Sequence, residues 1–258
     1  MDARSHCPRP SEPLDPTKEE VYSFVETIYK DLIEIVPDAL VHVGGDEVNL
    51  DCWESSKVIT KWMHKHNMSS SVELYEYFVT RLLRIVSGLG KKPIVWQEIF
   101  NFNLTITDET IVDVWKGFDT KTIEQATSSN FKVILSGCWY LDHLEKHWED
   151  FYRCDPRNFT GNKHNMIGGH ASMWGEHVDA SNFMSRVWPR ASSVAERLWT
   201  GDVVSAKKSI RERIHKFRCR LVLHGIDASP TGPGFCSHEV TFFAPVARCL
   251  FDQNTSLC

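Results

Sequence analysis

The sequence predicts an α/β fold with parallel strands, of the (β/α)8 barrel type. Short runs of branched and apolar residues alternate with amphipathic segments of helical periodicity, as in parallel α/β proteins. Successive strand runs end in tryptophan, tyrosine or carboxylate side chains, and barrel enzymes place their active sites at these carboxyl ends. The chain has 258 residues, close to the roughly 250 of a whole barrel. It contains only five barrel-type strand runs, which start near residue 40. We therefore expect an incomplete barrel: about the last five strands, their helices and a C-terminal cap.

The first predicted helix covers residues 17–36. Thr17 and Glu20 have the spacing of a capping box, and Pro37 ends the helix. The apolar segment LVHVGG, residues 40–45, follows as a short buried strand.

Further helices are predicted at about 54–66 and 72–88, the second opened by Ser70 with Glu73 and ended by Gly88 and Gly90. Four strand runs follow, the last of which carries two glycines: 93–98, 110–115, 131–136 and 165–174. A helix is predicted over 118–129, whereas 99–109 is too short and irregular for a good helix.

The last part of the chain predicts helices near 183–198 and 203–224. From residue 225 the sequence is rich in proline, glycine and cysteine. We expect residues 1–224 to form the partial barrel, and 225–258 to be an irregular, disulfide-pinned segment of the same domain.

The composition argues against several classes of protein. The net charge is −5 and no basic cluster appears, which gives no support for nucleic-acid binding. No apolar stretch is long enough to span a bilayer. The start, MDARSHCPRPSEP, is polar and proline-rich and therefore does not resemble a signal peptide.

The cysteines and sequons point to an oxidising, glycosylating compartment. None of the 8 cysteines forms a pair with zinc-site spacing, so we expect neither a metal nor another cofactor. Four N-x-S/T sequons begin at Asn67, Asn103, Asn158 and Asn254. Since no signal peptide precedes them, we expect the chain to be part of a longer secreted or lysosomal protein.

Two adjacent carboxylates, Asp46 and Glu47, follow the first strand. Glycoside hydrolases usually have a pair of carboxylates and aromatic side chains around the bound sugar. In such a pair, a like-charged neighbour keeps one carboxyl protonated. The alternative is an acidic pair that opens a helix. Successive strand residues face opposite sides, so both carboxylates reach one ligand only if Gly44 and Gly45 end the strand.

An ordered set of motifs adds a family resemblance. HVGGDEV is followed by CWES, IVWQEIF, VDVWKG, CWYLD, ASMWGEHVD and WPRASSVAERLW. From about Ser11 to Cys236 the chain resembles the β-N-acetylhexosaminidases of glycoside hydrolase family 20, of the animal lysosomal type. These enzymes remove terminal N-acetylhexosamine from glycoconjugates, and the acetamido oxygen of the substrate acts as the nucleophile.

The resemblance implies three catalytic residues. Glu47 would be the general acid and base, and Asp46 would accept the acetamido N–H and offset the charge that develops there. Tyr140 would hydrogen-bond the acetamido oxygen.

It also implies the residues that bind the sugar. Trp96, Trp115 and Trp174 would wall the acetamide and the sugar face, although each could instead belong to the core. Asp142 and Glu176 would bind the outer hydroxyls. An Asp at position 142 resembles the β-subunit type, which prefers neutral GlcNAc and GalNAc, because a carboxylate repels anionic sugars.

The family suggests disulfides Cys7–Cys52 and Cys219–Cys236, and proximity in sequence suggests Cys138–Cys154 and Cys249–Cys258. We expect a homo- or heterodimer. Two alternatives remain open: a truncated, inactive product that acts as a dimerisation partner or sugar-binding remnant, and a hydrolase of the chitinase type.

Overall fold

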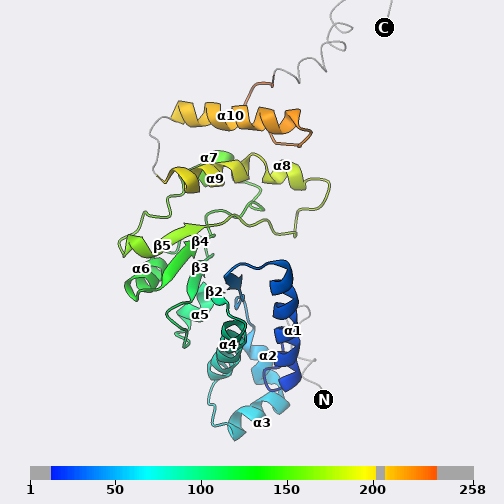
Figure 1. The fold of residues 1–258 in the computed structure, drawn as a ribbon, viewed down its shortest axis with the longest axis vertical. Helices are drawn as coiled ribbons and strands as arrows, with labels where there is room; N and C mark the ends of the chain where they lie inside the picture. The colour runs from blue at the N-terminus through cyan, green and yellow to red at the C-terminus, as the bar shows by residue number, and fades with distance from the viewer. Residues whose placement is uncertain (1–12, 202–206, 237–258) are drawn as a thin grey trace, which may run out of the picture. The chain divides into compact units, whose positions relative to one another are not determined.

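The structure is a computed structural model that describes residues 13–201 and 207–236. The chain divides into two compact units (Figure 1). The first unit contains the residues up to Gly137 together with Pro156–Gly169. The second contains Cys138–Asp155 and the residues from His170 onward.

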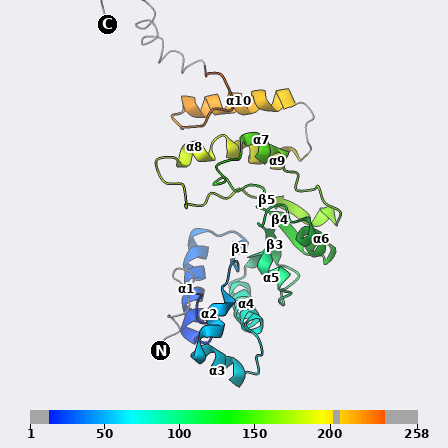
Figure 2. The same cartoon turned by 180° about the vertical axis from the view of Figure 1, so that it is seen from behind.

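The first unit is built on a five-stranded parallel sheet (Figures 1 and 2). Its strands lie in sequence order, β1 Leu40–His42, β2 Lys92–Trp96, β3 Ile111–Val114, β4 Lys132–Leu135 and β5 Met166–Gly169. Each strand pairs in parallel with its sequence neighbours. The predicted α/β class, with parallel strands connected in order as in part of a barrel, is confirmed.

The fifth strand is shorter than predicted. The run 165–174 gives only Met166–Gly169, and the register against β4 shifts between Val133 and Ile134. Gly168 has a φ of +150°, which residues other than glycine rarely adopt. The glycines therefore mark an irregularity in the ladder.

Helices alternate with these strands. They are α1 Glu19–Ile35, α2 Leu50–Ser55, α3 Lys57–Lys65, α4 Ser71–Gly88, α5 Gln97–Asn101 and α6 Thr120–Ser128, with a 3-10 turn, η2, at Lys163–Asn165. The predicted helix at 54–66 is split, because Ser56 leaves the helical conformation and caps α3 through the N–H of Ile59. A short helix, α5, also forms where we expected none from residue 99 onward.

Two predicted helix caps have different outcomes. Ser70 accepts a hydrogen bond from the N–H of Glu73, so the expected cap of α4 is confirmed. The Thr17–Glu20 capping box is wrong. Thr17 instead donates both its N–H and its hydroxyl to the carboxylate of Asp15, at 3.0 and 2.7 Å.

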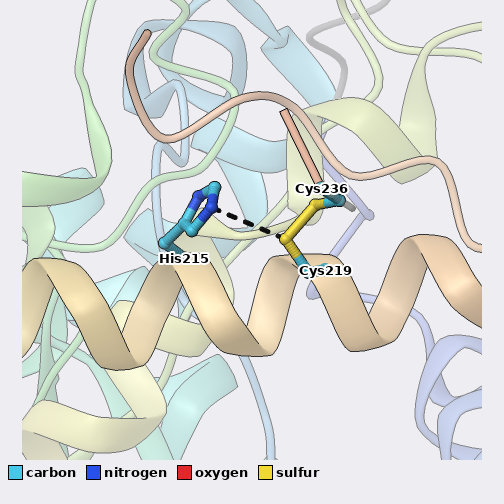
Figure 3. Close-up of side chains that lie close together, drawn as sticks. All are labelled: His215, Cys219 and Cys236. Carbon is cyan, nitrogen blue, oxygen red and sulfur yellow. Dashed lines mark hydrogen bonds between the residues drawn. A yellow bond between two sulfur atoms is a disulfide. The ribbon is translucent and has the colours of Figure 1, made fainter. Parts of the chain in front are cut away.

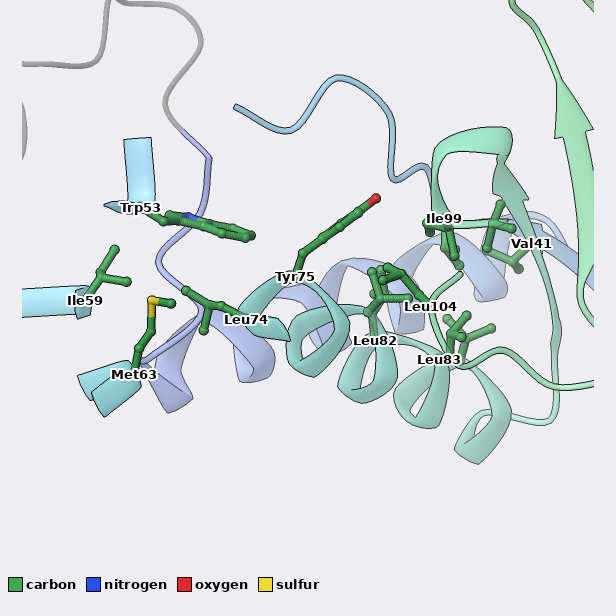
Figure 4. Packing of buried hydrophobic residues seen from close by; sticks show 14 residues of the cluster. Val41, Trp53, Ile59, Met63, Leu74, Tyr75, Leu82, Leu83, Ile99 and Leu104 are labelled. Carbon is green, nitrogen blue, oxygen red and sulfur yellow. The ribbon is translucent and has the colours of Figure 1, made fainter. Parts of the chain in front are cut away.

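The core of the first unit lies between α4 and strands β1 and β2 (Figure 4). Leu74, Tyr75, Leu82 and Leu83 recur on one face of α4, at the spacing of an amphipathic helix. They pack in one cluster with residues such as Val41 and Ile99, and with Trp53 and Met63 from α2 and α3. This packing fixes the loop that follows β1 against α4 and α5.

The second unit is helical. It contains α7 Trp148–Arg153, α8 Phe183–Val187, α9 Arg190–Thr200 and α10 Lys207–Leu223. The single helix predicted near 183–198 is two helices, because Pro189 lacks an N–H and its ring disfavours continuation of the helix. Trp148 and Tyr152 of α7 pack with Ile210 and Ile214 of α10. The predicted helix near 203–224 is confirmed over the described residues.

Two disulfide predictions are confirmed: Cys138–Cys154 and Cys219–Cys236. Cys52 is also disulfide-bonded, whereas Cys7, Cys249 and Cys258 lie outside the described residues. The segment after α10 is attached by further contacts, among them the Trp148 Nε1 hydrogen bond to Thr231 O at 3.0 Å. Within the described part of the chain, no helix is both long and apolar enough to cross a membrane.

Candidate active site

The loop after β1 carries the two adjacent carboxylates. Strand pairing continues just past β1, since Val43 N–H donates to Ile94 O at 2.8 Å and Trp96 N–H donates to Gly44 O at 3.0 Å. The chain then leaves the strand through left-handed conformations, with φ of +77° at Gly44 and +97° at Gly45. Asp46 and Glu47 therefore lie beyond the regular strand, where the alternation of side chains between two faces no longer applies.

Glu47 itself has a φ of +49°. A left-handed backbone is uncommon for a residue that is neither glycine, asparagine nor aspartate, and it costs about 1–2 kcal/mol. The side chain of Glu47 is exposed. The alternative of an acidic pair that simply opens a helix does not describe this loop, because the next helix begins only at Leu50.

Gly45 is tightly enclosed. A Cβ at this position would lie 2.4 Å from Ile99 Cδ1 and 3.2 Å from the hydroxyl of Tyr75. That hydroxyl donates a 2.5 Å hydrogen bond to Gly45 O. Burial raises the pKa of the Tyr75 phenol, and the nearby carboxylates of Glu98 and Asp46 raise it further. The Tyr75 hydroxyl, a neutral hydrogen-bond donor, therefore holds the loop at Gly45.

His42, at the end of β1, connects this loop to β3. Its Nδ1 accepts the N–H of Gly44 at 3.1 Å, so a neutral ring carries its proton on Nε2. Nε2 lies 3.4 Å from the fully buried carboxylate of Asp113, and Ser136 Oγ donates to the same carboxylate at 2.7 Å. The imidazole thus holds the start of the loop through the N–H of Gly44, while its Nε2 faces the Asp113 carboxylate without a hydrogen bond to it.

Two predicted sugar-binding tryptophans lie together at the carboxyl ends of β2 and β3. The rings of Trp96 and Trp115 are 6.2 Å apart at an interplanar angle of 65°, and Trp96 also lies 4.4 Å from the ring of His42. Both tryptophans are partly exposed, unlike fully buried core residues.

Glu98 and Gln97 position Trp115. The indole Nε1 of Trp115 donates to Glu98 Oε2 at 2.8 Å, and Lys116 Nζ lies 2.9 Å from Glu98 Oε1. Gln97 Oε1 accepts the N–H groups of Trp115 and Lys116 at 3.0 and 2.9 Å. Sequence reasoning missed both residues as site residues. The only available signal was their place directly after Trp96.

In the second unit, two chain segments form a short parallel pairing. Tyr140 forms a bridge with Ser172, and Leu141 N–H donates to Ser172 O at 2.7 Å. Two residues further along, Trp174 N–H lies 3.4 Å from Asp142 Oδ1. The pairing therefore brings the predicted residues Asp142 and Trp174 together. Tyr140 is buried, whereas Trp174 and Glu176 are exposed.

Arg190 holds the segment that carries Asp142. Its guanidinium is buried and donates to four backbone carbonyls: Leu141, His143 at 3.1 Å, Lys146 at 3.4 Å and Arg186 at 2.8 Å. Burial lowers the pKa of Arg190 and the Arg186 charge lowers it further, whereas the Asp142 carboxylate opposes that shift. Sequence analysis did not identify Arg190 as a positioning residue.

One cluster of metal-ligand residues occurs in the described part of the chain (Figure 3). His215, Cys219 and Cys236 converge, and His215 Nε2 lies 3.7 Å from Cys219 Sγ. The two sulfurs are bonded to each other as a disulfide, and metal binding requires thiolates. In this oxidised form the cluster therefore contains a covalent link between α10 and the segment that follows it.

The fold and the first-unit loop define the class of protein. Glycoside hydrolases act through a pair of carboxylates, and barrel enzymes carry their active sites at the carboxyl ends of parallel strands, which is where Asp46 and Glu47 follow β1. Residues 2–202 match the family model described as glycosyl hydrolase family 20, catalytic domain. The chain belongs to this family.

Individual relatives agree with that assignment. The chain is 39% identical to the beta-hexosaminidase subunit beta of Mus musculus over 88% of this chain and 44% of that protein. It is 36% identical to the subunit alpha of Rattus norvegicus over 88% of this chain and 45% of that protein. A solved chitobiase from Flavobacterium johnsoniae superposes with a TM-score of 0.72 and 30% identity, covering 83% of this chain and 34% of that one. The chain thus spans less than half the length of these relatives.

Proposed function

We propose that this chain carries the acid–base centre of a β-N-acetylhexosaminidase, which removes terminal non-reducing N-acetyl-β-D-hexosamine from glycoconjugates with retention of configuration. The observation that carries the proposal is the left-handed loop that places Asp46 and Glu47 after β1. The names of the relatives support the activity, since they are hexosaminidase subunits and a chitobiase.

In the proposed mechanism, Glu47 donates its proton to the oxygen of the leaving group. The acetamido oxygen of the substrate attacks the anomeric carbon, which makes this one of the substrate-assisted exceptions among glycosidases. Asp46 accepts the acetamido N–H and offsets the positive charge that grows on that nitrogen. Glu47 then takes a proton from the water that opens the oxazolinium intermediate.

The aromatic residues shape the sugar site. Tyr140 donates its phenolic proton to the acetamido oxygen and aims it at the anomeric carbon. Trp96, Trp115 and Trp174 enclose the acetamide methyl and the apolar face of the ring. The support for this role in the first unit is the orientation of Trp115 by the Glu98 carboxylate.

Asp142 and Glu176 bind the outer hydroxyls. A carboxylate at position 142 favours neutral GlcNAc and GalNAc over sulfated or sialylated sugars, because like charges repel. His143 follows Asp142 and softens that repulsion when it is protonated. We expect a ratio of neutral to sulfated substrate turnover that falls when Asp142 is replaced by Asn.

We further propose a homo- or heterodimer in the lysosome or the secretory route. The support is the naming of the relatives as alpha and beta subunits, together with the disulfides Cys138–Cys154 and Cys219–Cys236, which suit an oxidising compartment.

The test is hydrolysis of a chromogenic β-GlcNAc glycoside by the chain, compared with Glu47→Gln and with Glu109→Gln as a control. Glu109 is exposed and forms a surface ion pair with Lys92. We expect Glu47→Gln to lower kcat about 10²- to 10⁴-fold, and Glu109→Gln to change nothing. Absence of turnover with retained binding of a thiazoline that mimics the intermediate would instead support a sugar-binding remnant.

A further inference from the structure

Three of the four sequons lie in the described part of the first unit. They share an exposed asparagine, a middle residue that packs inward and a hydroxyl residue that is bound to a glutamate. The asparagines Asn67, Asn103 and Asn158 are exposed. Asn67 and Asn103 also have left-handed backbones, with φ of +58° and +54°, in the turns directly after α3 and α5. These side chains therefore stand at surface turns, where N-linked glycans are tolerated.

The middle residue of each sequon points inward. Leu104 is buried in the core cluster of the first unit, and Met68 packs against the same cluster. Phe159 is 6% exposed, and the following loop is so tight that a Cβ on Gly161 would lie 2.7 Å from Thr127 Oγ1. Because the middle side chain is anchored, the preceding asparagine is directed outward.

The hydroxyl residue of each sequon is bound to a glutamate through both its N–H and its hydroxyl. Ser69 binds Glu73, at 3.1 and 2.5 Å. Thr105 binds Glu76 at 3.1 and 2.6 Å.

The third pair follows the same rule across a longer sequence separation. Thr160 donates its N–H and hydroxyl to Glu124 Oε1 at 2.9 and 2.6 Å. Glu73 and Glu76 belong to α4 and Glu124 to α6, so these contacts exist only once the helices have formed and, for Thr105 and Thr160, have docked.

We propose that Asn67, Asn103 and Asn158 are attachment sites for N-linked oligosaccharides, and that transfer precedes folding of these turns. The donor is an oligosaccharide–diphosphate lipid. The Asn Nδ2 forms a bond to C1 of the sugar, the C1–O bond to the diphosphate breaks, the amide loses one proton, and the lipid diphosphate leaves. In the folded chain, the hydroxyl that the motif requires is committed to a glutamate, so the unfolded turn is the substrate.

The experiment expresses the chain behind a cleavable secretion leader in eukaryotic cells. The purified protein is treated with peptide-N-glycosidase in ¹⁸O-water, and its peptides are mapped by mass spectrometry. We expect ¹⁸O-labelled aspartate at the three positions. Asn130 is the matched control, since it is exposed with a φ of +67° but is followed by Phe131 and Lys132. An unlabelled asparagine at any of the three positions overturns the assignment for that site.

The order of events is tested with Glu76→Gln and Glu124→Gln, which weaken the contacts to Thr105 and Thr160. If transfer precedes folding, glycan occupancy at Asn103 and Asn158 stays unchanged. If occupancy rises in these variants, transfer occurs on the folded chain and that part of the proposal is wrong. Thr105→Ala is the positive control and removes the glycan at Asn103 alone. None of these readouts depends on glycosidase turnover.

Discussion

The indole Nε1 of Trp115 donates a 2.8 Å hydrogen bond to the carboxylate of Glu98, which is 7% exposed. The donor follows β3 and the acceptor follows β2, so one polar contact links the carboxyl ends of neighbouring strands. Lys116 balances the charge at the other carboxylate oxygen, at 2.9 Å. A tryptophan proposed to wall the sugar is thus fixed by hydrogen bonding and charge rather than by apolar packing alone.

Replacing Glu98 with Leu is expected to release the Trp115 ring and to lower the free energy of unfolding by about 1–3 kcal/mol, since the indole N–H loses its hydrogen bond to a charged acceptor. Glu98→Gln retains an oxygen acceptor for the indole and should cost less. Urea unfolding measures stability, and near-UV circular dichroism reports the ring environment. Equal effects of the two substitutions on the near-UV signal would contradict this role.

Gly45→Ala is expected to be more damaging than Gly44→Ala. Both glycines have a left-handed φ, so each substitution costs about 1–2 kcal/mol of backbone strain. Only the Cβ at position 45 meets a neighbour, at 2.4 Å from Ile99, whereas position 44 has no atom within 4 Å. Thermal denaturation of both variants measures the difference. Partial rescue of Gly45→Ala by Ile99→Ala, in a double-mutant cycle, would identify the collision as its cause.

Arg190→Lys should loosen residues 141–146 although it keeps the positive charge. An ammonium cannot reproduce the fork of donors that reaches four carbonyls. The contact to Leu141 O is buried, so that carbonyl alone costs about 1–3 kcal/mol when it is left without a partner. Hydrogen exchange followed by mass spectrometry is expected to show faster exchange in the peptide that contains Asp142. Arg84→Lys, at an exposed position of α4, is the control, and equal exchange in both variants would refute the positioning role.

The contact between Glu124 and Thr160 should depend on acidity in a defined direction. The hydrogen bond from the Thr160 side chain lowers the pKa of Glu124 below its ordinary value of 4.5. Because the folded pKa lies below the unfolded one, the contact contributes stability above pH 4.5 and loses it as the pH falls through the folded pKa. NMR titration of Glu124 measures that pKa. Thr160→Val is expected to raise the pKa back toward 4.5, and an unchanged titration would contradict the assignment.

Much of the fold followed from local patterns. Branched apolar runs predicted β1 to β4 because parallel strands are buried on both faces, and Ser70 predicted the start of α4 because a hydroxyl satisfies free N–H groups. Prediction failed where distinct local contacts competed. Asp15 takes both donors of Thr17, and Pro189 divides a segment with continuous helical periodicity. The short helices α2 and α7 contain too few turns to display a period.

The positions of several candidate residues at strand ends were predictable from the sequence, whereas the side chains that support them were not. Asp46 follows the first predicted strand run, and Trp96 and Trp115 lie at the ends of the next two, while their roles toward a sugar stay predictions. The supports act over long separations in sequence: Arg190 reaches Leu141 and Ser136 reaches Asp113. Hydrogen bonds between residues that are far apart in the sequence produce no recognisable spacing of residue types. A single buried Asp or Arg within a strand or helix also produces no periodic pattern.

The left-handed conformation of Glu47 has a practical consequence for protein engineering. Asparagine and glycine tolerate this conformation better than glutamate does, so replacement of Glu47 by either residue should raise the melting temperature while it removes the proposed proton donor. Selection of library variants by heat resistance alone would therefore enrich variants that lack the proposed proton donor. A screen for a more stable variant should exclude residue 47 from randomisation or select for the proposed glycosidase activity at the same time.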